Sequence, residues 1–143
     1  ESRNKLVEGQ ILAQWAMLYL NSPRSKSDLD AAQKLLNRAL LKAPSEGSIY
    51  AGLASCMLKT GKTQVATQFV DNALLLDPSN WQALWLKHRL CEEAGKTKDL
   101  ALVVAQLQRY YPELPQVKDA AGKLPSLKHS PSKAVGGVGK GRR

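Results

Sequence analysis

The sequence predicts an all-α fold, a right-handed α-solenoid of three helical hairpins with a short C-terminal capping helix and a basic tail. Two observations carry this prediction. Residues 32–44, which end in Pro44, have a copy 34 residues later that ends in Pro78, and a weaker third copy ends in Pro112. Gly61 and Gly95 are also 34 residues apart, where a left-handed residue would let the chain reverse between two helices. A fixed period of this length is typical of stacked repeats, which bury their apolar faces against their neighbours.

The expected helices follow from apolar spacing and from the positions of proline and glycine. The first covers residues 4–20 and ends at Asn21-Ser22-Pro23, because proline lacks an amide donor. The second runs to Lys42, and Ser27 or Asp28 is expected to cap its N-terminus through a side-chain hydrogen bond. The remaining helices are expected over residues 48–60, 63–76, 81–94, 98–110 and 117–124.

These helices divide the chain into five segments. They are a first repeat at 1–46, with an N-terminal extension and a longer inter-helix loop, repeats at 47–80 and 81–114, the latter degenerate, a capping helix at 115–125, and a basic flexible tail at 126–143. Three repeats are near the minimum for a stable array. Residue 1 is Glu rather than Met. We therefore expect the chain to be an excerpt of a longer array, or to pair with another subunit.

Composition indicates an intracellular protein, cytoplasmic or nuclear. No apolar run approaches the roughly 18–20 residues of a membrane span, and no secretory signal is visible, so we expect no membrane partner. Cys56 and Cys91 have no cysteine or histidine at metal-ligand spacing and are interpreted as packing residues of a reduced protein. The net charge of +9 is concentrated at the end of the chain, since residues 118–143 alone hold +6.

The residue pattern of the second repeat identifies a family. Its large and small residues are Tyr50, Leu53, Ala54, Met57, Gly61, Ala66, Val70, Ala73 and Pro78. The first repeat supplies Trp15, Ala16, Tyr19, Ala32, Leu36, Ala39 and Pro44. This pattern resembles the tetratricopeptide repeat, whose period is 34, over about residues 9–114. The third repeat departs from it, with Lys87 and His88 in the places of Leu53 and Ala54. The pentatricopeptide class, which would imply one RNA base per repeat, has a different pattern and is disfavoured.

The resemblance implies a concave groove, lined by the first helix of each repeat, that takes a peptide or helix of a partner protein. Carried over to this sequence, the lining residues are Gln10, Ala13, Gln14, Met17, Ser48, Ala51, Gly52, Ser55, Lys59, Gln82, Trp85, Leu86, Arg89 and Glu93. Trp85 and Arg89 are one turn apart and share a helix face, and Trp and Arg are frequent binding hot spots. The alternative for Trp85 is that it packs under the tail and closes the array.

Some tetratricopeptide domains bind the C-termini of heat-shock chaperones through a carboxylate clamp of Lys, Asn and Arg. Here Gly52, Gln82 and Leu86 occupy the second- and third-repeat positions of such a clamp. No fork of positive charge is expected at these positions. The chaperone-clamp function is therefore disfavoured by the sequence.

Catalytic patterns are missing from the sequence. His88 has no Ser, Cys or Asp placed to form a relay, and His129 lies in the tail. Glu92 and Glu93 are adjacent, so they point to different sides of their helix. The glycines around Lys140 have neither a preceding strand nor a following helix, as a phosphate loop requires. We expect no enzyme activity, no cofactor and no metal.

Two functions remain open. The first is a protein-interaction module or adaptor that binds a partner peptide or helix in the groove, within a larger complex or a longer array. The second is an RNA-associated subunit whose tail contacts phosphates through Lys128, Lys133, Lys140, Arg142 and Arg143. The tail can equally dock on an acidic protein or remain solvated. It has no interleaved aromatics for base stacking, and phosphate on Ser130, before Pro131, would lower its charge.

Overall fold

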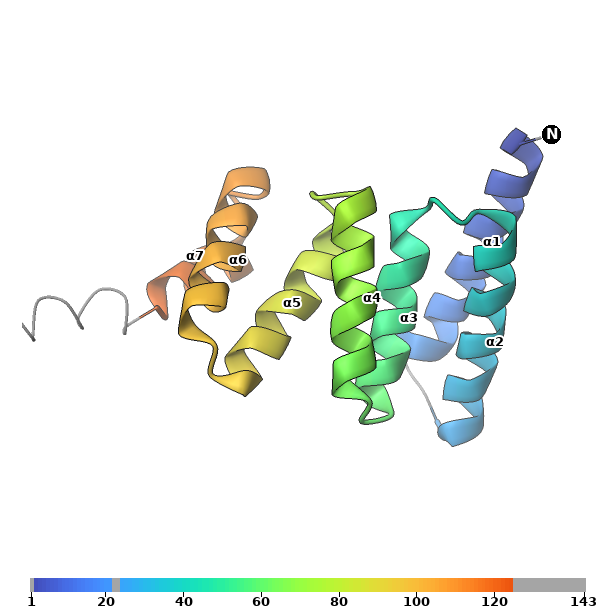
Figure 1. Cartoon of the computed structure of the whole chain (residues 1–143), viewed down its shortest axis with the longest axis horizontal. Coiled ribbons are helices and arrows are strands. Elements are labelled where there is room, and N and C mark those ends of the chain that lie inside the picture. Colours follow the sequence, from blue (N-terminus) through green and yellow to red (C-terminus); the bar gives the residue numbers. More distant parts are fainter. Residues whose placement is uncertain (1, 22–23, 125–143) are drawn as a thin grey trace, which may run out of the picture. The chain divides into compact units, whose positions relative to one another are not determined.

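The structure is a computed structural model that describes residues 2–21 and 24–124. Within these ranges the regular secondary structure consists of seven α-helices (Figure 1). They are α1 (Ser2–Asn21), α2 (Lys26–Lys42), α3 (Gly47–Lys59), α4 (Thr63–Leu76), α5 (Trp81–Ala94), α6 (Thr97–Tyr110) and α7 (Pro115–Gly122). The chain divides into two compact units, Glu1–Leu90 and Cys91–Arg143. None of the helices described is long and apolar enough to cross a membrane.

The helix ends follow the turn residues of the sequence. Gly61 and Gly95 have φ angles of +81° and +69°, so both occupy the left-handed region in which the chain reverses. The helix α7 begins at Pro115, two residues before the expected start. Proline is favoured at the first helical position because its missing amide has no partner there in any case.

The expected cap of α2 is wrong. Ser25 stands at the N-cap with an extended backbone and makes no side-chain cap hydrogen bond. Asp28 lies in the first turn, and its Oδ2 accepts a hydrogen bond of 2.8 Å from the backbone N–H of Arg24. The carboxylate therefore fixes the residue that precedes the helix, and its negative charge lies near the positive end of the helix dipole.

Two glycines let the first helix of a hairpin lie close to the second. A Cβ added to Gly9 would lie 2.7 Å from the Cβ of Ala43, and one added to Gly47 would lie 3.3 Å from the Cβ of Asp77. Gly9 and Gly47 therefore occupy equivalent places in α1 and α3. They are 38 residues apart, whereas Ala43 and Asp77 are 34 apart, so extra residues lie between α1 and α2.

The core of the first unit is built from alanine and leucine. In Figure 1, α1 to α4 lie side by side as antiparallel pairs. Ala16, Ala32 and Ala39 are fully buried in a cluster that joins α1, α2 and α3. A second cluster packs Ala54 and Val70, of α3 and α4, against leucines of α5. Small residues thus lie where the helices cross closely, and leucines fill the space between them.

The second unit has its own packed pair of helices. Val103, Val104 and Leu107 of α6 are buried, and α6 contacts α7. Val117 and Ala120 of α7 are buried as well. The short helix α7 therefore covers apolar surface of α6.

Candidate functional site

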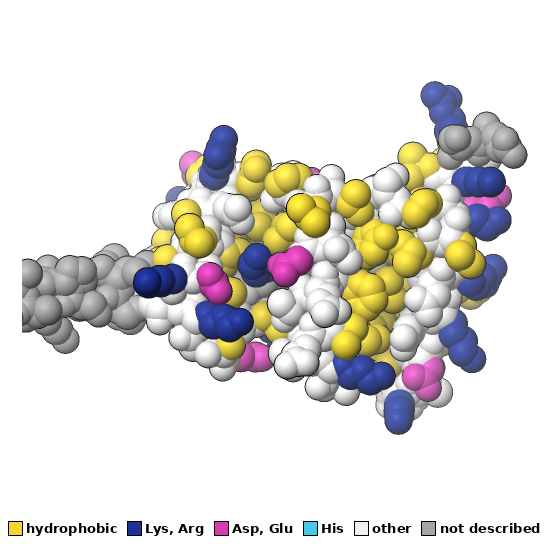
Figure 2. Space-filling model, in the orientation of Figure 1, with side chains coloured by type: hydrophobic (Ala, Val, Ile, Leu, Met, Phe, Trp, Pro, Cys, Tyr) yellow, Lys and Arg dark blue, Asp and Glu magenta, His cyan; other side chains and the backbone are white. Residues whose placement is uncertain are grey.

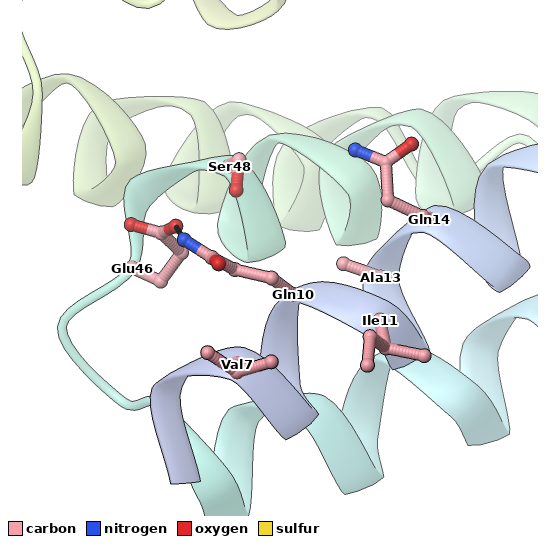
Figure 3. Close-up of a pocket in the computed structure, with 7 residues that line it drawn as sticks. All are labelled: Val7, Gln10, Ile11, Ala13, Gln14, Glu46 and Ser48. Atoms are coloured by element: carbon pink, nitrogen blue, oxygen red, sulfur yellow. Dashed lines mark hydrogen bonds between the residues drawn. The ribbon is translucent and has the colours of Figure 1, made fainter. Parts of the chain in front are cut away.

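Four of the predicted groove residues, Gln10, Ala13, Gln14 and Ser48, line one cavity in the first unit (Figure 3). Its volume is about 410 Å³, and its lining consists of Val7, Gln10, Ile11, Ala13, Gln14, Glu46 and Ser48. The Nε2 of Gln10 donates a hydrogen bond of 3.0 Å to Oε2 of Glu46. This bond ties α1 to the connection that precedes α3. The cavity therefore presents amide, hydroxyl and carboxylate groups beside an apolar edge of α1.

A second contact brings two more predicted residues together. The Nε2 of Gln82 in α5 lies 3.9 Å from the Sδ of Met17 in α1. The helix α3 contacts α1, and its Ala51 clusters with Ala83 of α5. The contact between Met17 and Gln82 therefore passes over α3, whose side chains there are small. The first helices of three hairpins thus contribute to one surface.

Aromatic stacking holds Trp85 on α5. Its ring is 5.2 Å from that of Trp81, with an interplanar angle of 14°, and 4.8 Å from that of His88, with an angle of 11°. Trp85 is half-buried and Arg89 is exposed, while His88 is buried. The stack fixes the indole in place and leaves part of it accessible. The alternative that places Trp85 under the tail involves residues outside those described.

The remaining predicted residues separate into accessible and buried ones. Ser48 and Lys59 are exposed and Ser55 is half-buried, so these three are available on α3. The expectation that Gly52 lines the groove is wrong. A Cβ added to Gly52 would lie 2.9 Å from Cδ2 of Leu36, so this residue faces α2. Ala51 and Leu86 are also buried and offer little surface to a ligand, whereas Ala13 is buried but borders the cavity.

Charged side chains lie mainly away from these uncharged groups. Figure 2 shows Lys and Arg side chains along the edge formed by α1 and α2. One of them, Lys42, forms an ion pair of 3.1 Å with Glu8. On α5, Lys87 forms an ion pair of 3.2 Å with Asp71 of α4. The candidate site contains three glutamines and two serines, and its charged residues in the first unit are Glu46, Lys59 and Arg89.

The described residues hold no group of three or more His, Cys, Asp or Glu side chains that could bind a metal ion. Burial raises the pKa of the Cys56 thiol to about 11, against a smaller lowering by the charge of Lys59. The thiol therefore stays protonated at neutral pH and is a poor nucleophile. Cys91 is buried too.

Glu46, Val7 and Ile11 belong to the cavity but were not predicted from the sequence. Glu46 lies in the connection between two hairpins, where the repeat pattern assigns no ligand position. Ile11 recurs at helical spacing with other apolar residues of the first helix, so the sequence alone does not distinguish it from a core residue. The basic-tail residues Lys128, Lys133, Lys140, Arg142 and Arg143 lie outside the described residues.

Comparisons with known proteins show which repeat type and which folds this chain resembles. A model of the tetratricopeptide repeat family matches residues 24–90. A comparison with curated proteins gave no match. Among solved structures, the Arabidopsis OM64 TPR domain is similar with a TM-score of 0.72 and 16% identity, over 85% of this chain and 98% of that chain.

Two other similar structures contain bound peptides. The first TPR of Spaghetti (RPAP3), bound to the HSP90 peptide SRMEEVD, has a TM-score of 0.72 and 14% identity, over 84% of this chain and 94% of its own. The second TPR domain of human RPAP3, in complex with the HSP70 peptide SGPTIEEVD, has a TM-score of 0.66 and 15% identity, over 87% of this chain and 98% of its own.

These likenesses confirm the predicted fold class, an all-α array of helical hairpins of the α-solenoid type. At such low identity they carry the fold alone. The family match and the repeat pattern in the sequence together identify the repeat type. Residues 24–90 therefore form a region of tetratricopeptide repeats, as the sequence pattern predicted.

Proposed function

We propose that this chain is a non-catalytic interaction module that binds a peptide or helix of a partner protein on the groove face of its first unit. The fold is one that serves protein interaction. The observation that carries the proposal is the convergence of Gln10, Gln14 and Ser48 on one cavity, while farther along α1 Met17 contacts Gln82 of α5. Membership of a larger complex is part of the same proposal.

The chemistry of this surface favours an uncharged polar ligand. Glutamine amides both donate and accept hydrogen bonds, so Gln10, Gln14 and Gln82 can pair with the backbone of an extended peptide. Ser48 and Ser55 add hydroxyl groups. Two of the similar structures hold peptides that end in EEVD. Where a carboxylate clamp needs Lys, Asn and Arg, this chain has Gln82 and the buried Gly52 and Leu86. We therefore propose a ligand other than an acidic C-terminal peptide.

A peptide library displayed on phage and selected on the immobilised full chain tests the proposal. Selected peptides are expected to lose binding to the double variant Gln10→Ala/Gln82→Ala, because the side chains that pair with their backbone are removed. Gln68→Ala/Gln108→Ala provides the control, since both residues are exposed on second helices. Peptides SRMEEVD and SGPTIEEVD serve as comparison probes. Selected peptides that bind all variants equally, or tight saturable binding of either EEVD peptide, would contradict the proposal.

A further inference from the structure

One face of α1 carries a row of large apolar side chains that remain accessible. Val7, Ile11, Trp15 and Leu18 are spaced by four, four and three residues, so they lie on the same side of the helix. Their exposed fractions are 45%, 60%, 49% and 72%. We call these four residues the α1 stripe. Scattered apolar residues on a surface are ordinary, but a contiguous row along one helix indicates an interaction site.

The repeat itself shows what covers this face elsewhere in the chain. Because Gly9 of α1 corresponds to Gly47 of α3, Ile11, Trp15 and Leu18 correspond to Ile49, Leu53 and Cys56. The exposed fractions of these α3 residues are 0%, 1% and 1%. They are members of the cluster that joins α3 to α2.

Gly52 lies among Ile49, Leu53 and Cys56 on α3 and shows which helix this face packs against. A Cβ added to Gly52 would meet the side chain of Leu36 in α2. The three positions therefore face the second helix of the preceding hairpin.

The third hairpin gives the same result. The equivalent positions of α5 are Ala83, Lys87 and Leu90. Ala83 clusters with Ala73 of α4, and Leu90 clusters with Val70 of α4. Lys87 forms its ion pair with Asp71, also of α4. In both cases the three positions contact the second helix of the hairpin before them.

We propose that the α1 stripe is a docking surface for a helix of a partner protein, namely the second helix of a further hairpin of tetratricopeptide type. The helix α2 shows the chemistry that such a partner needs. It covers α3 with alanine and leucine at one-turn spacing, through Ala32, Leu35, Leu36 and Ala39. A partner with this face would bury the stripe, and its own preceding helix would extend the groove.

A second copy of this chain does not provide this surface. The helix α2 already contacts α3, and α4 already packs against α5. The helix α6 contacts α7, which buries Val117 and Ala120. Each second helix thus has its contact face occupied. Among the described residues, no second helix is therefore free to cover the stripe, and the covering helix comes from a partner.

A hollow beside the stripe offers room for side chains of the partner. Trp15 and Leu18 border a cavity of about 390 Å³ together with Tyr19, Arg24 and Asp28. Arg24 and Asp28 add charged groups to this lining, while Trp15 and Leu18 add apolar surface. A hydrophobic centre with a polar rim is the usual anatomy of a specific interface.

A tandem duplication of residues 9–46 within the full chain tests whether the stripe accepts such a helix. It places a second α2 ahead of α1 and joins them through residues 43–46, the same connection that joins α2 to α3. The outer copy carries Trp15→Gln, so that the two copies differ in mass. Amide hydrogen exchange in the inner α1 is expected to slow at least about tenfold, because the helix becomes covered. Unchanged or faster exchange would overturn the proposal.

Matched variants and an association measurement complete the test. Leu18→Glu in the inner copy should abolish the slower exchange, whereas Leu41→Glu should preserve it. Leu41 is 84% exposed, and its equivalent Leu75 is 81% exposed within the stack. Equal effects of the two variants would count against the stripe. Sedimentation of the chain of residues 1–143, without the duplication, tests whether a second copy binds the stripe. A monomer agrees with the proposal, whereas a dimer that Leu18→Glu alone dissociates would overturn it and assign the stripe to self-association.

Discussion

At the scale of single residues, Gly9 reverses the usual effect of glycine in a helix. Glycine inside a helix ordinarily costs about 1 kcal/mol relative to alanine, because it loses more backbone freedom on folding. The close approach of α1 to α2 changes this, since a Cβ at Gly9 would lie 2.7 Å from the Cβ of Ala43. Both atoms are carried directly by backbone, so neither can rotate away. The helices would have to separate.

We therefore expect Gly9→Ala to lower the free energy of unfolding by about 1–3 kcal/mol, the usual cost of overpacking. Urea denaturation of the full chain measures it. Gly122→Ala is the control, because a Cβ at Gly122 meets nothing within 4 Å. That substitution should be neutral or stabilising by up to about 1 kcal/mol. A stabilised Gly9→Ala variant would show that α1 and α2 lie farther apart.

At the scale of the element, the reversal between α3 and α4 depends on backbone conformation alone. Gly61 has a φ of +81°, and a side chain there would meet nothing within 4 Å. Any loss of stability on substituting Gly61 therefore comes from the backbone conformation and not from a steric clash. The same holds at Gly95, between α5 and α6, where φ is +69°.

Gly61→Ala should destabilise the fold by about 1–2 kcal/mol, because residues with a Cβ disfavour the left-handed region. Gly61→Asn should cost less, since asparagine tolerates this conformation. Thermal unfolding of the three proteins measures the order, which is expected to be Gly, Asn, Ala. Equal destabilisation by alanine and asparagine would indicate a clash rather than a backbone effect.

At the scale of the whole molecule, the positive charge bears on the alternative function, an RNA-associated subunit. Residues 126–143 hold five Lys and Arg and no acidic residue, so their removal lowers the net charge from +9 to +4. If the tail binds RNA phosphates, truncation after residue 125 should weaken binding to a single-stranded RNA. The slope of log K against log salt should fall by up to about 3.5, or 0.7 for each phosphate that the tail neutralises. Filter binding at several salt concentrations measures it, and an unchanged slope would exclude the tail from RNA binding.

Much of this molecule could be predicted from its sequence, because a period of 34 fixes where helices begin and end. The bounds of α4 and the reversals at Gly61 and Gly95 were predicted correctly. The cap of α2 was predicted wrongly. The Asp28 carboxylate can accept a hydrogen bond either from a free amide of the first turn or from the amide of a residue before the helix, and the sequence does not distinguish these two partners. Gly52 was misplaced because the facing of a residue depends on how the helix is rotated against α2. The contact between Met17 and Gln82, 65 residues apart, has no local signal.

That contact has a mechanical consequence. Met17 of α1 and Gln82 of α5 are joined by a thioether and an amide, a weak pair compared with the alanine contacts of the core. A bound peptide that separates these two side chains would break the contact at little cost, while the buried alanines stay packed.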